Sequence, residues 1–197
     1  SPDLLTRLGV LFGFIYGGSS LEEIDDAVEE FKDRFNLARY LAEDVKWLAA
    51  NSDPRGLVRQ ETFPMRKAYL TGEDQPTWVD PEYVARRIVY HWGKCRLEQL
   101  IEVKQAIWRA MGQTGIAQGC IFLARGIGSL SQDQIEDIET MRLALGGNEI
   151  IKILNIRPSP IVGDALDYLE EMVLRDPKLN NKESLSEILK QWWSERQ

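Results

Sequence analysis

Signals that begin and end helices recur along the whole chain, and they restrict its possible folds more than any other feature. Ser20 with Glu23, and Ser131 with Gln134, have the spacing of a capping box. In that motif a hydroxyl at the helix start and a carboxyl or amide three residues later exchange hydrogen bonds with the backbone. No segment shows the sustained alternation of apolar and polar residues that a half-buried strand requires. The sequence therefore predicts an all-α fold.

Apolar residues at helical spacing divide the chain into segments. They predict helices over 4–16, 21–34, 37–50, 81–92, 97–111, 115–126 and 132–145, a short helix after Gly147, another beginning at Pro160, and a last one over 182–193. Three prolines between 51 and 80 predict a long connection with one short helix near 64–70. We expect a multi-helix body of two helical lobes with a C-terminal tail. The predicted parts are an N-terminal helical lobe (1–51), a Pro-rich connection (52–80), a helical body (81–145) and a helical tail (146–197).

Composition narrows the setting in which the protein works. Cys95 and Cys120 lie in apolar helical surroundings, so we expect reduced thiols and a cytoplasmic protein. The apolar runs are far shorter than the ~20 residues of a membrane span, so no membrane partner is expected. Because the sequence begins at Ser1 without Met, we expect a processed product or part of a longer protein.

The net charge of -7 is unevenly distributed along the chain. Between Leu21 and Arg34, seven acids face two bases, which indicates a solvated face or a surface for homo- or hetero-association. The segments 55–67 and 81–111 are basic, with four bases against one acid and six against three. Nucleic-acid contact is expected in these middle segments and in the tail, unless the charges are ordinary solvated helix faces.

The segment from Gly147 to Leu166 has the pattern of a short helix, a Pro-rich hairpin and a second helix. Ser159 is a favoured N-cap and Pro160 suits the first helical position. The start of a helix leaves backbone N–H groups unpaired and carries partial positive charge, so an anion can bind there. The N–H groups of Ile161, Val162 and Gly163 would bind the anion, and Arg157 could supply a full positive charge to the same anion. The alternative is that Ser159 and Pro160 only begin a helix that packs on the body.

A longer stretch, from Met141 to Trp193, resembles the C-terminal tail of bacterial class II tRNA nucleotidyltransferases and poly(A) polymerases. In that family a Gly precedes a short helix that ends in a Leu-Gly-Ile-like step, followed by a Pro-Gly-Pro-like hairpin, a Val-Gly pair and an apolar helix. The corresponding residues here are Gly147, Leu154-Asn155-Ile156, Pro158-Ser159-Pro160, Val162-Gly163 and Ala165-Leu166-Tyr168-Leu169. Asn155 and Ser159 replace two of the family's usual glycines.

The resemblance implies that this chain is the body and tail of such an enzyme without its catalytic head. The head would carry a Gly-Ser pair and an Asp-x-Asp motif, and would use Mg²⁺ with ATP or CTP; neither motif occurs here. No catalytic residue, metal site or cofactor is therefore predicted in this chain, which should not add nucleotides alone. Its implied role is to anchor tRNA or another structured RNA for CCA or poly(A) addition by the parent protein.

His91 is the single histidine of the chain. A metal-dependent HD phosphohydrolase needs several His and Asp ligands, which one imidazole cannot supply; by resemblance, residues 1–51 look like a remnant of that fold without metal ligands. Arg87, His91 and Lys94 have the helical spacing i, i+4, i+7, so they are candidates for a second RNA-binding path. The alternative is that His91 is a satisfied boundary residue.

Two other functions are also compatible with the sequence. The first is a helical protein–protein interaction module that uses the acidic helix 21–34 together with exposed aromatic residues, of which Trp78, Trp192 and Trp193 are the candidates. The alternative for the paired Trp residues near the chain end, and the more frequent one, is that they close the core. The second is a hydrolase whose site no motif reveals.

Overall fold

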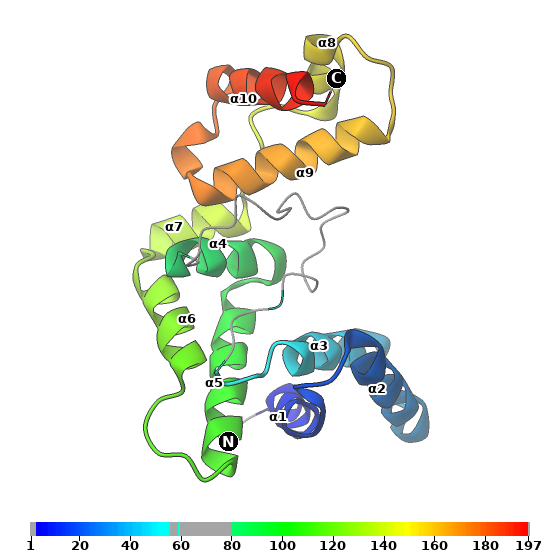
Figure 1. Cartoon of the computed structure of the whole chain (residues 1–197), viewed down its shortest axis with the longest axis vertical. Helices are drawn as coiled ribbons and strands as arrows, with labels where there is room; N and C mark the ends of the chain where they lie inside the picture. The colour runs from blue at the N-terminus through cyan, green and yellow to red at the C-terminus, as the bar shows by residue number, and fades with distance from the viewer. Residues whose placement is uncertain (1–2, 56–58, 60–79, 197) are drawn as a thin grey trace. The chain divides into compact units, whose positions relative to one another are not determined.

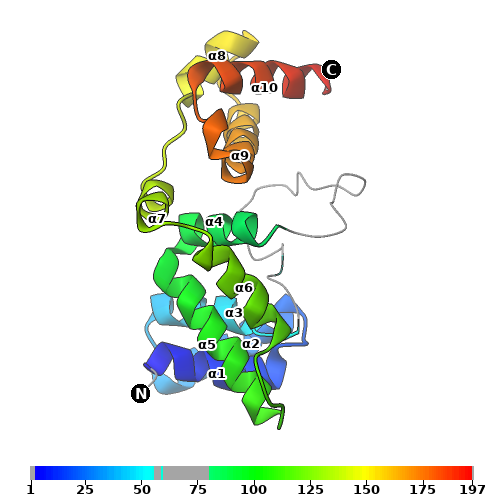
Figure 2. The same cartoon turned by 90° about the vertical axis from the view of Figure 1, so that its left-hand side faces the viewer.

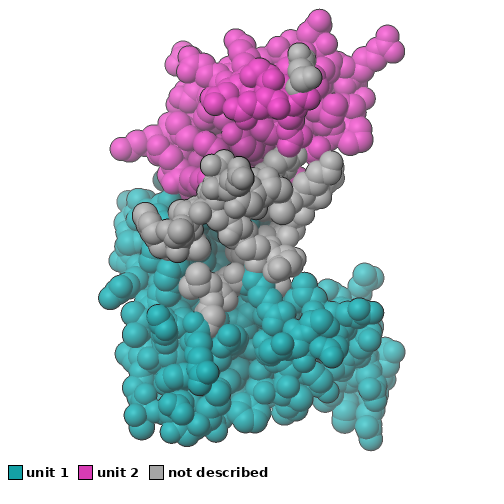
Figure 3. All heavy atoms as spheres, viewed as in Figure 1, with its two compact units in different colours: residues 1–63, 80–139 teal, residues 64–79, 140–197 magenta. Residues whose placement is uncertain are grey.

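The computed structural model of the protein describes residues 3–55, 59 and 80–196. Within these residues the chain forms ten α-helices and one short 3-10 helix, and no strand (Figure 1). This confirms the all-α prediction. The short helix predicted near 64–70 lies outside the described residues. The chain divides into two compact units, the first containing residues 1–63 and 80–139 and the second containing 64–79 and 140–197 (Figure 3).

The first unit contains seven of the described helices. They are α1 (Leu4–Tyr16), α2 (Leu21–Phe35), α3 (Arg39–Ala50), α4 (Pro81–Trp92), α5 (Lys94–Ala110), α6 (Gln118–Gly128) and α7 (Gln132–Glu139). Helix α1 packs against α3 and α5, while α2 and α3 form an antiparallel hairpin. Helix α4 packs against α5, α6 and α7, and Figure 2 shows α5 and α6 side by side.

Glycines permit the close approach of α1 to its neighbours. A Cβ atom at Gly13 would lie 2.5 Å from the side chain of Ser52, and one at Gly9 would lie 3.1 Å from Leu48 and Val103. The apolar core beneath α1 includes Leu8, Phe12, Ile24, Val28, Ala42 and Val45, all buried. The inner side of α1 is therefore held by close apolar packing.

Two helix starts follow the predicted capping boxes. Glu23 N donates to Ser20 Oγ at 3.2 Å and Ser20 N donates to the Glu23 carboxylate at 2.9 Å, which completes the capping box of α2. The corresponding bonds between Ser131 and Gln134 are 3.2 and 2.8 Å long at the start of α7. These local motifs alone account for where both helices begin.

The end of α7 differs from the prediction. The sequence pattern predicts a helix to Leu145, but α7 ends at Glu139. The cause lies 36 residues further along the chain, where the Asn180 side chain accepts from Ala144 N at 2.8 Å and donates to Arg142 O at 3.0 Å. Leu145 is 2% exposed in the core of the second unit, so its burial there replaces the last helical turn.

The second unit is built from α8 (Gly147–Leu154), α9 (Pro160–Arg175), the 3-10 helix η2 (Pro177–Leu179) and α10 (Lys182–Ser194). Its core consists of Leu145, Ile150, Leu154, Ala165, Leu169, Val173, Leu185, Leu189 and Trp192. Lys182 Nζ binds the Glu149 carboxylate at 2.6 Å and so links the starts of α10 and α8. Among the helices that the structure describes, none has the length and apolar character needed to cross a bilayer.

Candidate nucleic-acid interface

The connection between α8 and α9 is short and well defined. Helix α8 ends at Leu154. Its C-cap residue, Asn155, has a φ of 51° in the left-handed region, which Asn tolerates better than most residues. Ile156 N then donates to Ile151 O at 3.2 Å, which closes the last turn. Arg157 and Pro158 are exposed, and α9 begins at Pro160 as predicted. Asn155 thus provides the left-handed turn that ends α8.

Apolar contacts hold both sides of this connection. Ile156, Ile161 and Val162 are partly buried and pack against the core of the second unit. A Cβ atom at Gly147 would lie 3.3 Å from Val162 Cγ1, so the starts of α8 and α9 are in close contact. Because the apolar side chains turn inward, Arg157 is left on the outer surface. Its side chain makes no ion pair among the residues that the structure describes.

The first turn of α9 differs from the expected cap. Ser159 occupies the N-cap position, yet its Oγ is buried and forms no hydrogen bond in the described structure. Val162 N donates to the backbone oxygen of Ser159 at 3.0 Å, so this amide is already paired within the turn. The prediction that the N–H groups of Ile161, Val162 and Gly163 are all unpaired is therefore wrong for Val162. Any anion at this helix start would rely on the helix dipole, the other amides and Arg157.

Arg87, His91 and Lys94 lie along α4 and the start of α5, but in different environments. Arg87 is 2% exposed, with its guanidinium 5.6 Å from the centre of the Tyr83 ring. His91 is half-buried, and its burial, together with the nearby charge of Arg87, lowers its pKa to about 4. Lys94 Nζ lies 3.8 Å from the Glu98 carboxylate. At neutral pH His91 is thus uncharged, and the three side chains do not form one exposed basic stripe.

The other bases of the middle segments are mostly engaged within the protein. Lys104 is fully buried and its Nζ donates to Asp53 O at 2.5 Å, while Arg96 binds Asp44 at 2.6 Å. Arg86 forms an ion pair with Glu82. Arg59 donates through both terminal nitrogens to Ser19 O and Gly17 O, each at 2.9 Å. Arg66 and Lys67 lie outside the described residues. The basic composition of 81–111 therefore produces much less positive surface than its count of charges indicates.

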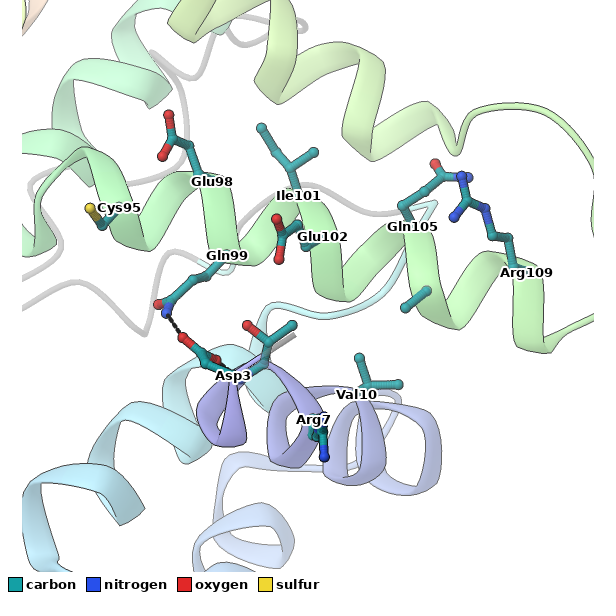
Figure 4. A pocket seen from close by; sticks show the side chains of 12 residues that line it. Asp3, Arg7, Val10, Cys95, Glu98, Gln99, Ile101, Glu102, Gln105 and Arg109 are labelled. Carbon is teal, nitrogen blue, oxygen red and sulfur yellow. Dashed lines mark hydrogen bonds between the residues drawn. The ribbon is translucent and has the colours of Figure 1, made fainter. Parts of the chain in front are cut away.

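A groove of about 1150 Å³ runs between α1 and α5 (Figure 4). At one end the Asp3 carboxylate accepts a hydrogen bond from Gln99 Nε2 at 3.2 Å. Its charged lining is mixed, with the acids Asp3, Glu98 and Glu102 and the bases Arg7 and Arg109. Sequence reasoning missed this groove, because its residues come from segments about 90 positions apart and share no motif. Its mixed charge does not favour a phosphate backbone.

The acidic helix is partly neutralised by one lysine. Lys46 Nζ on α3 contacts Asp25 at 2.6 Å, Glu29 at 2.6 Å and Glu43 at 3.3 Å. Hydrogen bonds from Lys32 and Lys46 lower the pKa of Glu29 to about 2. In the described part of the chain, His, Cys, Asp and Glu side chains form no cluster that could hold a metal ion. The acids of α2 thus serve in part to attach α2 to α3.

The aromatic residues proposed for protein docking are differently placed. Trp192 is 3% exposed and belongs to the core of the second unit, and Trp193 packs partly against the same core. Trp192 is therefore not available for docking, and the alternative that the paired Trp residues close the core is confirmed for Trp192. Trp78 lies outside the described residues. Comparisons of the chain with family models, curated proteins and solved structures found no match.

Proposed function

We propose that this chain is the RNA-anchoring C-terminal part of a tRNA nucleotidyltransferase or poly(A) polymerase. On this proposal, residues 1–51 and 81–145 form the lobes of the helical body, and residues 146–197 form its helix-hairpin-helix-like tail. The observation that carries the proposal is the α8–α9 connection. The apolar motif residues Leu154, Ile156 and Val162 pack inward, and Arg157 is exposed beside the start of a sixteen-residue helix.

The proposed binding mode follows from the charge at this helix start. The aligned peptide dipoles of α9 place partial positive charge near Pro160, and the guanidinium of Arg157 supplies a full charge three residues earlier. Both attract a phosphate oxygen, whereas neither reads the identity of a base. The contact therefore positions an RNA backbone without sequence preference, as contacts to phosphate and ribose do. Affinity should fall steeply as salt is added.

A titration of this chain with tRNA at several salt concentrations tests the proposal. Arg157→Ala should weaken binding roughly tenfold and reduce the slope of log affinity against log salt by about one. Gly163→Asp adds a negative charge in the first turn of α9, and should weaken tRNA binding although no basic residue is removed. Lys190→Ala is the matched control, because Lys190 is also exposed in the second unit but lies on α10.

Binding by both variants that equals that of the unaltered chain would remove the α8–α9 connection from the account. Absence of tRNA binding at low salt would refute the proposed function as a whole. The chain alone should add no nucleotide to tRNA with Mg²⁺ and CTP or ATP, because the proposal assigns catalysis to a head that this sequence lacks. In the longer parent protein, the catalytic head would use Mg²⁺ with ATP or CTP.

A further inference from the structure

Helix α1 is apolar on nearly all sides. Arg7 is its only charged residue, although only one side of the helix packs against α3 and α5. On the outer side, large apolar side chains are exposed: Leu4 by 58%, Leu11 by 48%, Phe14 by 54% and Ile15 by 58%. A helix that is hydrophobic all round is normally buried, so this outer side is a candidate contact surface.

The surface continues onto α2 through a shallow groove of about 220 Å³. Leu11 and Ile15 line it from α1, while Phe31 and Phe35 line it from α2. The rings of Phe31 and Phe35 lie 4.5 Å apart between centroids, and Phe35 is 61% exposed. The aromatic wall is thus ordered by its own packing, yet open on its outer side.

Two opposite charges border the groove. Glu30 and Arg34 lie one helical turn apart on α2, and both belong to the groove lining. Neither forms an ion pair among the residues that the structure describes, with each other or with a third residue. This distinguishes them from Asp25 and Glu29 on the other side of the same helix, which bind Lys46.

A surface with one acid and one base spaced along a helix is complementary to itself when a second copy is related by a twofold axis. In such an isologous contact, residue i of one copy meets residue j of the other, and j meets i. Two antiparallel α2 helices would place Glu30 opposite the second copy's Arg34, and Arg34 opposite its Glu30. The exposed side chains of Leu11, Ile15 and Phe35 beside the groove would meet apolar side chains of the second copy, which excludes water from them.

We propose that the groove between α1 and α2 is the interface of a homodimer, with a second copy of this chain as its occupant. The apolar groove supplies the stability of the contact, while the two Glu30–Arg34 pairs fix its register and orientation. An RNA backbone does not fit this surface, because it is apolar and its charges are balanced. The inference is independent of the RNA proposal, since no residue of the second unit takes part.

Sedimentation equilibrium over a range of protein concentrations tests the dimer through a charge exchange. Glu30→Arg alone would place two pairs of like charges across the interface, as would Arg34→Glu alone. Each should weaken dimerisation by roughly tenfold or more. The double variant with both substitutions restores opposite charges in reversed order and should dimerise like the unaltered chain.

Asp33→Arg is the control, because it changes the charge of α2 equally at an exposed residue outside the groove. It should leave dimerisation unchanged. Circular dichroism spectra establish that each variant keeps its helices. A chain that stays monomeric at all accessible concentrations would overturn the proposal, and so would a dimer that is unaffected by the single exchanges or that the double variant fails to restore.

Discussion

The backbone of Gly126 in α6 lies directly against the carbonyl group of Pro81, the first residue of α4. A Cβ atom at Gly126 would lie 2.1 Å from the Pro81 oxygen and 2.9 Å from the Ala85 side chain. Both the oxygen and the carbon of this peptide group belong to the backbone, so no side-chain rotation could make room for it. The close contact of α6 with α4 therefore requires a residue without a side chain at position 126, as the glycine-rich sequence of α6 indicates.

We predict that Gly126→Ala destabilises the first unit by about 2 to 4 kcal/mol, because α4 and α6 must separate to accommodate the methyl group. Gly128→Ala is the matched control in the same helix, since a Cβ atom there meets nothing within 4 Å. That variant should be neutral or slightly more stable. Urea unfolding measures both free energies. Equal stabilities for the two variants would contradict the packing that we describe.

The pH dependence of stability provides a test of the His91 environment. The pKa of His91 falls to about 4 from its usual 6.5, first because of burial and then because of the Arg87 charge. Between these two pH values the unfolded chain binds a proton that the folded chain does not, so stability rises with pH across this window. Replacing His91 with Gln should reduce this rise. A parallel pair of stability curves from pH 4 to 6.5 would show that His91 keeps its ordinary pKa.

Lys104 gives a second, more alkaline window. Burial is the largest influence on this fully enclosed amine and lowers its pKa from 10.5 to about 8. The unfolded chain therefore holds the extra proton between pH 8 and 10.5, and stability should rise with pH there. Lys104→Met should remove that rise while keeping the fold, because an apolar side chain of similar length avoids burying a charge. Thermal unfolding at several pH values measures the slope. Retention of the full slope in the Met variant would place its origin elsewhere.

The predictable parts of the fold are those determined by neighbouring residues. The capping boxes at Ser20 and Ser131 predict where α2 and α7 begin, and Pro160 predicts the start of α9. The end of α7 was not predictable, because it depends on an amide at Asn180 that is distant in the sequence. The spacing of apolar residues indicates which segments are helical. It carries no information about hydrogen-bond partners from a distant segment.

The residues of the candidate site also divide into those whose placement follows from the local sequence and those whose placement depends on tertiary packing. The exposure of Arg157 and the start of α9 follow from the local pattern of apolar and polar residues. The burial of Arg87 and Lys104 does not, because a count of charges cannot distinguish a base on the surface from one that tertiary packing encloses. For a related reason, no sequence motif predicts the groove between α1 and α2. It exists only because two apolar helix faces are left uncovered side by side.

The two hydrogen bonds of Asn180 have a consequence for how the second unit is made. Ala144 N and Arg142 O obtain these bonds from a side chain that follows α8 and α9. During synthesis on the ribosome, these bonds can therefore form only after Asn180 has emerged, when α8 and α9 have already been made. The segment 142–144, which precedes α8, is thus fixed by these bonds later than its position in the chain suggests.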